Sequence, residues 1–357
     1  MDRTEGFKDR ILQEDLERIV QSGIPIDEMR NSTVFITGAT GLIGSLLVRT
    51  FAYYNRMTDA GIRIIALARD PGKAEAVHGQ LLQEPWLDLL TGDVTEKVEV
   101  KPKIDYIFHC AAITASKEMA DRPVEVLMTS VLGTRNVLDL AARKTVKSFL
   151  YLSSMEMYGV FEGGISPVTE TDLGYIDLLK VRSNYPESKR LCENLCVAYR
   201  NEYNVPVKIA RLAQTFGAGV LPGDNRVFAQ FARSVIRGED IVLHTLGNSE
   251  GNYCYTSDSI KGLLLILLKG NNGEAYNVSN EETHTTIIDM AHMVSERIAG
   301  GKITVRLELS EEKARIYAAD TKMKLSSGKL RRLGWKPEVG LEEAYRRFIE
   351  SMKDGSL

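Results

Sequence analysis

Cysteine is scarce in this sequence of 357 residues, and the four present (Cys110, Cys192, Cys196 and Cys254) form no C-x-x-C pair. So few cysteines predict no disulfide framework. Cys192 and Cys196 would lie one helical turn apart, but no cluster of His or Cys stands near them. We therefore expect these two to be small buried apolar residues rather than ligands, and we predict no metal site.

The sequence also lacks a strong net charge and a long apolar run. Its net charge of −3 gives no electrostatic reason to expect nucleic acid or an anionic membrane as a partner. The longest Leu/Ile run, residues 263–268, is far below the roughly 20 residues that cross a bilayer. The first residues carry charge and do not resemble a secretory signal. We expect a soluble, cytoplasmic protein with reduced thiols.

A glycine-rich turn stands between an apolar strand and a helix near the start of the chain. The β-branched run at residues 34–36 predicts a buried strand, and Gly38, Gly41 and Gly44 follow it. Glycines let the backbone approach a ligand closely, and a helix N-terminus offers unpaired N–H groups to a phosphate. The spacing G-x-x-G-x-x-G differs from the usual dinucleotide fingerprint, and such turns also close strands for structural reasons alone.

Strands and helices alternate through about the first 210 residues. Apolar runs predict further strands at 62–68, 87–94, 104–112 and 149–152, and a helix at 124–144. This alternation predicts an α/β protein with a Rossmann-type, doubly wound parallel sheet.

The pattern changes twice along the chain, which predicts three parts. Residues 1–30 are charged with apolar positions at helical spacing, and we expect a helical arm that Pro25 ends. Residues 31–215 form the predicted NAD(P)-binding Rossmann domain, to which later strands return. Residues 216–357 form, in the main, a smaller α/β domain for the substrate.

The ends of the second, third and fourth predicted strands carry candidate cofactor ligands. The second strand ends at Arg69 and Asp70; an Arg there can accept the 2′-phosphate of NADP, whereas an acid can bind the ribose of NAD. The choice stays open at this point. Asp93 ends the third strand and could reach an adenine amino group. In the fourth strand, we expect His109 to be a core histidine.

Ser154, Tyr185 and Lys189 form the strongest catalytic constellation in the sequence. Tyr185 and Lys189 share one helix face at i and i+4. An ammonium group beside a phenol favours the phenolate, so we expect Lys189 to lower the pKa of Tyr185. A serine at the end of the fifth strand can share the substrate oxygen whose proton the tyrosine moves.

Several motifs together resemble one enzyme family. They are TGATGLIG at 37–44, GDV at 92–94, HCAA at 109–112, SSMEMYG at 153–159 and YPESK at 185–189, with weaker matches RLAQTFG at 211–217 and YCYTSD at 253–258. The chain resembles an extended short-chain dehydrogenase/reductase of the NAD-dependent epimerase/dehydratase family, the sugar-nucleotide enzymes.

The resemblance implies an enzyme that binds NAD, or NADP if Arg69 reads the phosphate, and oxidises a nucleotide sugar, usually at C4. It implies that Tyr185 is the base, that Lys189 tunes it and that Ser154 polarises the reacting oxygen. The implied cofactor residues are Gly38, Thr40, Gly41, Leu42, Ile43, Gly44, Arg69, Asp93, Val94, Ala111, Ala112, Tyr185, Lys189 and Leu212. The implied substrate residues are Thr114, Ser154, Met155, Gln214, Arg226 and Asn252.

Two positions depart from the family pattern and bear on the reaction. Dehydratases of the family carry Asp-Glu after the serine, but this chain has Met155-Glu156, and a thioether cannot donate a proton. We therefore favour epimerisation or decarboxylation, with Glu156 as a catalytic residue, over 4,6-dehydration. Gly251 stands where relatives have an Arg that grips a phosphate or carboxylate, and Arg226, Arg233 or Arg237 could supply that charge instead.

Two other functions remain as alternatives. Arg69 is compatible with an NADPH-dependent reductase of keto sugars or other carbonyl compounds. A catalytically silent dinucleotide-binding subunit is the third hypothesis. By analogy with the family, we expect a homodimer formed through the two long helices that carry residues 124–144 and 185–200.

Overall fold

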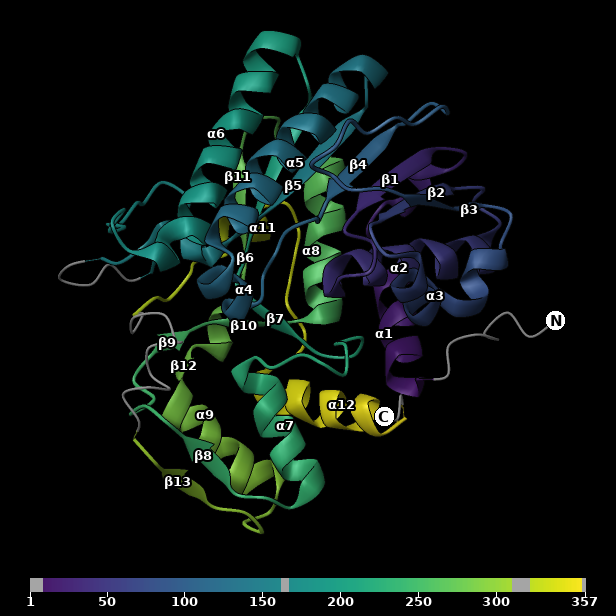
Figure 1. The fold of residues 1–357 in the computed structure, drawn as a ribbon. Coiled ribbons are helices and arrows are strands. Elements are labelled where there is room, and N and C mark those ends of the chain that lie inside the picture. The colour runs from purple at the N-terminus through teal and green to yellow at the C-terminus, as the bar shows by residue number, and fades with distance from the viewer. Residues whose placement is uncertain (1–8, 162–166, 310–321, 355–357) are drawn as a thin grey trace.

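A seven-stranded parallel sheet forms the centre of the larger part of the molecule (Figure 1). The computed structural model describes residues 9–161, 167–309 and 322–354. The strand order is β11-β6-β5-β4-β1-β2-β3, and every neighbouring pair is parallel. The strands are β1 (Thr33–Thr37), β2 (Arg63–Ala68), β3 (Leu87–Thr91), β4 (Tyr106–His109), β5 (Ser148–Ser154), β6 (Val207–Leu212) and β11 (Ala275–Val278). The predicted doubly wound α/β class is confirmed.

Helices cover both faces of this sheet. The helices are α2 (Leu42–Thr58), α3 (Pro71–His78), α4 (Ser116–Asp121), α5 (Pro123–Lys144), α6 (Asn184–Tyr203) and α8 (Thr256–Lys269). Helices α5 and α6 pack together on one face, and α2 and α8 lie on the other (Figure 1). Alternate residues of β1 divide accordingly: Val34 and Ile36 join the core under α2 and α8, and Phe35 joins the core under α5 and α6. Both faces of the strand are therefore buried.

The predicted strand ends differ from the observed ones at three places. β3 ends at Thr91 and β4 at His109, so Asp93 and Ala111 lie in the loops that follow. β5 runs two residues further than predicted, to Ser154, because Ser153 and Ser154 continue to pair with β6. The candidate ligands thus gather at the carboxyl edge of the sheet.

The chain after β6 builds a separate apolar core. Its elements are β7 (Gln214–Phe216), α7 (Val227–Arg237), β8 (Ile241–Leu243), β10 (Tyr253–Tyr255), α9 (Ile287–Met293), β13 (Val305–Leu307) and α12 (Leu341–Asp354). The same part of the chain also holds β9 (Glu250–Gly251) and β12 (Thr285–Thr286), whereas α11 (Gly328–Arg331) packs on β11 and its Leu330 joins the core of the central sheet. Phe216 stacks on Phe228 with ring centroids 4.9 Å apart, and Tyr345 and Phe348 of α12 close the cluster. The three-part division of the chain remains a prediction.

The N-terminal helix α1 (Arg10–Val20) packs against α2, α8 and α12. It ends at Val20, so the prediction that Pro25 ends it was wrong; a one-turn helix at Ile26–Met29 follows the proline instead. The arm lies against the body of the same chain, close to the C-terminal helix (Figure 1).

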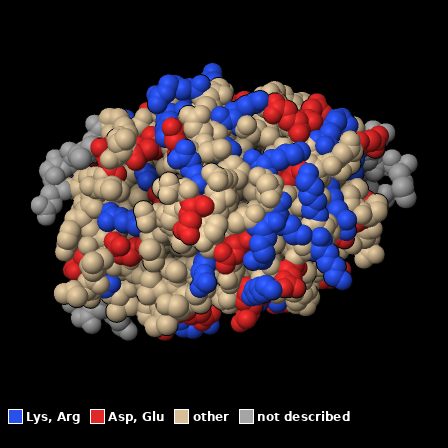
Figure 2. Space-filling view, turned by 90° about the horizontal axis from the view of Figure 1, so that it is seen from above, with Lys and Arg blue, Asp and Glu red and all other residues tan. Residues whose placement is uncertain are grey.

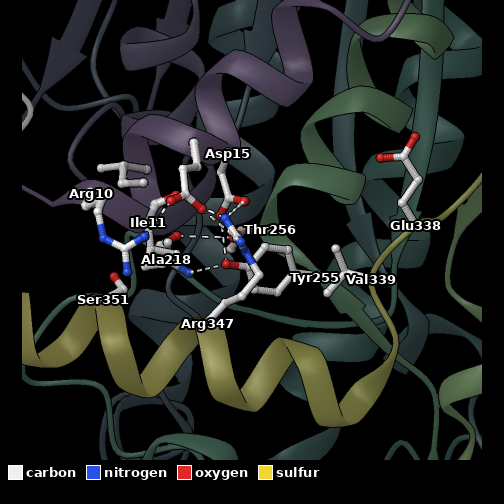
Figure 3. A network of polar contacts seen from close by, with 12 residues as sticks. Arg10, Ile11, Asp15, Ala218, Tyr255, Thr256, Glu338, Val339, Arg347 and Ser351 are labelled. Carbon is white, nitrogen blue, oxygen red and sulfur yellow. Dashed lines mark hydrogen bonds and ion pairs between the residues drawn. The ribbon is translucent and has the colours of Figure 1, made fainter. Parts of the chain in front are cut away.

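A buried polar cluster, the Asp15 cluster, fastens α1 to α12 and to β10 (Figure 3). Asp15 is 2% exposed; it accepts hydrogen bonds from Arg347 of α12 at 2.8 Å and from Tyr255 of β10 at 2.7 Å. The Tyr255 hydroxyl also lies 3.4 Å from the Ala218 nitrogen, in the loop after β7. Burial raises the pKa of Asp15 to about 6, although Arg347 and Tyr255 favour its charged form.

The surface carries both signs of charge. Lys and Arg side chains are interspersed with Asp and Glu on the face shown in Figure 2. Many of them form ion pairs, such as Arg63 with Asp88 at 2.6 Å. Within the described ranges, no helix is long and apolar enough to cross a membrane.

Candidate active site

The glycine turn is built so that side chains are excluded from it. Gly38 has φ +63°, and a Cβ there would lie 2.8 Å from the Ala111 backbone. A Cβ at Gly44 would lie 2.2 Å from the Gly38 carbonyl oxygen. Gly41 is the N-cap of α2 and offers no side-chain hydrogen bond, so among the described residues no cap competes with an anion for the first N–H groups of the helix, at Leu42 and Ile43. This cradle fits a dinucleotide diphosphate.

The adenosine end of the cradle holds charges of both signs. Arg69 follows β2 and lies 3.7 Å from Asp93 and 3.9 Å from Glu125. Asp70 caps α3 by accepting a hydrogen bond from the Lys73 nitrogen, so its carboxylate is already engaged. The pKa of Asp93 lies below its usual value: burial opposes the charge, but hydrogen bonds from Thr95 and the charge of Arg69 outweigh burial.

Three further predicted cofactor residues, Val94, Ala111 and Ala112, lie in the loops after β3 and β4. Val94 is buried, and its side chain fills the space over Gly133 of α5. Ala111 lies under the turn, and Ala112 follows it in the same loop.

Ser154, Tyr185 and Lys189 come together at the carboxyl end of β5. Ser154 is the last residue of β5, and its hydroxyl accepts a hydrogen bond from the Glu156 nitrogen at 3.2 Å. Tyr185 and Lys189 lie one turn apart near the start of α6, and both are buried. The Lys189 ammonium donates to the Leu152 carbonyl at 2.8 Å and lies 5.6 Å from the centre of the Tyr185 ring. The three side chains therefore share one site.

The pKa of Tyr185 differs from the sequence-based expectation. Burial raises it well above its ordinary value, and the charge of Glu156 raises it further; a hydrogen bond with Ser154 and the charge of Arg182 act in the opposite direction. Burial also lowers the pKa of Lys189. The expectation that Lys189 brings the pKa of the phenol down is thus not met, because burial outweighs the neighbouring charges.

Arg182 is a site residue that sequence reasoning missed. It lies in the one-turn helix Val181–Ser183 before α6, and its Nη2 is 3.1 Å from Glu156 Oε2. Its Nε is buried and has no hydrogen-bond partner in the part of the chain that the structure describes. The signal available in the sequence was its position three residues before Tyr185, on the approach to the catalytic helix.

Met155 and Gly251, the two positions that depart from the family pattern, lie next to each other. Met155 is 6% exposed, and a Cβ at Gly251 would lie 3.4 Å from its methyl carbon. Both positions where the family pattern carries a polar group are therefore apolar and adjacent.

The remaining predicted cofactor and substrate residues differ in how well their positions fit ligand contact. Leu212, a predicted cofactor residue, is the register partner of Ser154. Gln214, a predicted substrate residue, begins β7 two residues later. Thr114 is exposed in the loop after β4. Asn252 is fully buried; it donates to the Asn280 carbonyl and accepts from the Leu325 nitrogen, so its geometry gives no support for substrate contact.

The arginines proposed to replace the missing one at Gly251 are engaged near α7. Arg226 forms an ion pair with Asp224 at 2.5 Å and stacks on Phe228, although its charge still reaches Tyr185. Arg233 donates to the Asp224 carbonyl at 2.7 Å, and Arg237 lies 3.9 Å from Glu239. Among the three, Arg226 acts on the site most directly.

The histidine and cysteine predictions agree with the structure. His109 is buried between Thr37 at 2.7 Å and Thr134 at 3.1 Å, and burial lowers its pKa to about 3. Cys192 and Cys196 are buried and free. No group of His, Cys, Asp and Glu able to hold a metal occurs among residues 9–161, 167–309 and 322–354.

Known proteins share this sequence pattern and this fold. The model of the NAD dependent epimerase/dehydratase family matches residues 34–279. UDP-glucuronic acid decarboxylase 6 of Arabidopsis thaliana is 30% identical over 90% of this chain and 89% of its own length. UDP-glucuronic acid decarboxylase 1 of Xenopus tropicalis is 28% identical over 91% of this chain and 73% of its own.

Two solved structures show the same fold. An epimerase from Methanothermobacter thermautotrophicus has a TM-score of 0.77 and 24% identity, covering 97% of this chain and 96% of its own. The UDP-glucose 4-epimerase of Thermotoga maritima has a TM-score of 0.75 and 21% identity, covering 90% and 99%. The resemblance drawn from the motifs is confirmed: the chain belongs to the NAD-dependent epimerase/dehydratase family.

Proposed function

We propose that this protein modifies a nucleotide-diphosphate sugar through a 4-keto intermediate, with an epimerase- or decarboxylase-like outcome. The observation that carries the proposal is the meeting of Ser154, Tyr185 and Lys189 at the end of β5, where the Glu156 backbone N–H donates to the Ser154 hydroxyl. Two UDP-glucuronic acid decarboxylases are related to the chain over at least nine-tenths of its length, which supports the substrate class.

The cofactor that the family implies is NAD, and the residues of the glycine turn fit it. Gly38, Gly41 and Gly44 leave room for the diphosphate, and the N–H groups that open α2 would bind its charge. When bound, NAD supplies a hydride acceptor beside the sugar carbon. Lys189, held under the Tyr185 ring, would bind the adjoining ribose.

Each side chain of the site has a task in this scheme. Tyr185 takes the proton of the C4 hydroxyl as a phenolate, which burial makes a stronger base by raising the pKa of the phenol. The Ser154 hydroxyl stabilises the same substrate oxygen by a hydrogen bond. The resulting ketone acidifies the neighbouring C–H, or allows the neighbouring carboxylate to leave as CO₂, and the hydride then returns to C4. Glu156, held by Arg182, is placed to move the proton that an epimerase- or decarboxylase-like outcome requires.

The apolar wall made by Met155 and Gly251 argues against 4,6-dehydration. That reaction needs an acid to protonate the leaving hydroxyl, and a buried thioether beside a glycine offers none.

The test is incubation with UDP-glucuronate, UDP-glucose and the corresponding dTDP-, GDP- and CDP-sugars, followed by NMR. Conversion to a pentose nucleotide with release of CO₂, or to a C4 epimer, supports the proposal. Formation of a 4-keto-6-deoxy sugar contradicts it. Tyr185→Phe is the matched control, because it removes the hydroxyl alone.

A keto-sugar or carbonyl reductase is the second candidate, on the strength of Arg69. Its side chain is 66% exposed beside the cradle, where a 2′-phosphate could displace its ion pair with Asp93. Arg69→Ala should then weaken NADPH binding far more than NADH binding. Mass spectrometry of the dinucleotide released on denaturation gives an independent answer: NAD favours the first proposal and NADP the second.

We propose that the protein is a homodimer paired through α5 and α6. Val124, Met128 and Leu132 are exposed at successive four-residue steps along α5, and Leu191 of the adjoining α6 is 53% exposed. Such a stripe is suited to pairing with its own copy about a twofold axis. Light scattering should give about twice the monomer mass of 39.8 kDa, and Met128→Glu with Leu132→Glu should halve it.

We also propose a cytoplasmic location. The support is chemical: all four cysteines are free thiols, and three of them are buried.

A further inference from the structure

His78 of α3 forms a hydrogen bond with the backbone of the glycine turn. It is the last residue of α3, it is 4% exposed, and its Nε2 lies 3.1 Å from the Ala39 carbonyl oxygen. A carbonyl only accepts hydrogen bonds, so the imidazole carries its proton on Nε2. Its Nδ1 is buried without a partner among the described residues. The imidazole therefore makes a single hydrogen bond, and that bond goes to the turn.

The imidazole is also kept neutral. Burial lowers the pKa of His78 to about 4, and the nearby charge of Arg49 adds to this effect. Arg49 itself donates to the Val77 carbonyl at 2.7 Å, which fixes it beside the end of α3. A neutral imidazole adds no positive charge to the turn. Its contribution is therefore to orient the Ala39 carbonyl through the hydrogen bond.

The bonded carbonyl fixes the direction of a neighbouring N–H. In a trans peptide the C=O of Ala39 and the N–H of Thr40 point opposite ways. The Ala39 nitrogen is held as well, because it donates to the Leu67 carbonyl of β2 at 3.2 Å. With Ala39 held on both sides, the Thr40 N–H faces away from α3, and within the described ranges it has no hydrogen-bond partner.

We propose that His78 is a positioning residue that aims the Thr40 N–H at the diphosphate of the bound dinucleotide. Its action passes through the Ala39–Thr40 peptide, and it touches no cofactor atom itself. The same helix starts at the Asp70 cap beside Arg69, so α3 joins the ribose end of the cradle to the diphosphate end. The inference rests on the dinucleotide site alone and not on the sugar chemistry.

The test replaces His78 with Gln and with Asn, two amide side chains of different length. The amide nitrogen of Gln can occupy the place of Nε2, whereas that of Asn reaches only the place of Nδ1. After removal of copurified dinucleotide, calorimetry should show NAD bound by His78→Gln within about threefold of the wild type. His78→Asn and His78→Leu should bind it at least about tenfold more weakly, the size of one hydrogen bond to a charged group.

Adenosine, which has no diphosphate, is the control ligand and should bind all variants alike. Equal NAD binding by His78→Asn and wild type overturns the proposal. So does an equal loss for adenosine and NAD, which would mean that His78 only supports the fold. If His78→Leu does not fold, the Gln–Asn pair decides. Since no sugar is present, failure here leaves the proposed reaction untouched.

Discussion

The cofactor side and the sugar side of the site differ in how closely they follow the family pattern. On the cofactor side, Gly38 and Gly44 leave no room for a Cβ, which would lie 2.8 Å and 2.2 Å from backbone atoms. On the sugar side, Met155 and Gly251 replace polar groups, and Arg226 forms an ion pair with Asp224. The comparison teaches that the backbone packing of the cofactor side dictates its residues, whereas the substituted positions of the sugar side meet no such backbone constraint.

The largest expected effect is the loss of turnover on replacing Tyr185, which is assigned both to the cofactor site and to the reaction of the sugar. Tyr185→Phe should lower turnover of the sugar by about 10³-fold or more, because proton transfer from the hydroxyl is lost. NAD affinity measured by calorimetry should change by less than about threefold. A variant that keeps wild-type turnover would remove Tyr185 from the mechanism.

A pair of glycine substitutions tests the comparison directly. Gly44→Ala places a Cβ 2.2 Å from the Gly38 oxygen, so the turn must distort, and NAD binding should fall by about 100-fold. Gly251→Ala places its Cβ at 3.4 Å from the flexible end of Met155, and both NAD affinity and melting temperature should stay near wild type. Equal losses from the two variants would break the distinction.

Glu156→Gln should separate the first oxidation from the later proton transfer. The variant keeps shape and hydrogen bonding but loses the base, so product formation should fall by about 10- to 100-fold. Reduction of bound NAD on adding sugar, followed at 340 nm, should persist. Loss of that absorbance change together with the product would mean that Glu156 serves the oxidation step.

A separate effect, on stability rather than on binding or turnover, concerns the Asp15 cluster, which joins α1 to the C-terminal helix. The pKa of Asp15 rises from 3.8 to about 6 on folding, so the folded protein binds more protons than the unfolded one between these values. The Asp15 contribution to the free energy of unfolding should therefore decrease as pH rises from about 4 to 6, by the order of 2–3 kcal/mol.

Asp15→Asn removes that pH-dependent contribution. Urea unfolding of both proteins at pH 4, 5, 6 and 7 should show the stability advantage of the wild type over the variant shrinking with pH. A constant difference would mean that Asp15 is charged throughout.

Local signals predicted the parts of the site that depend on local geometry. The glycine turn, and Tyr185 with Lys189 on one helix face, follow from spacing within a few residues. The partners of Glu156 and Asp15 do not, because Arg182 lies 26 residues from Glu156 and Arg347 lies 332 residues from Asp15. The pKa of Tyr185 also escaped prediction, since burial is a property of the packed structure and outweighs the charge of one neighbour.

The Asp15 cluster has a consequence for folding during synthesis on the ribosome. Asp15 is translated early, but Arg347 follows 332 residues later. At about 5–20 residues per second, the wait between them is roughly 15–70 s. During that time α1 can pack its apolar face against α2 and then α8, but it cannot complete its polar contacts with α12. The last helix to be synthesised therefore also completes the packing of the first.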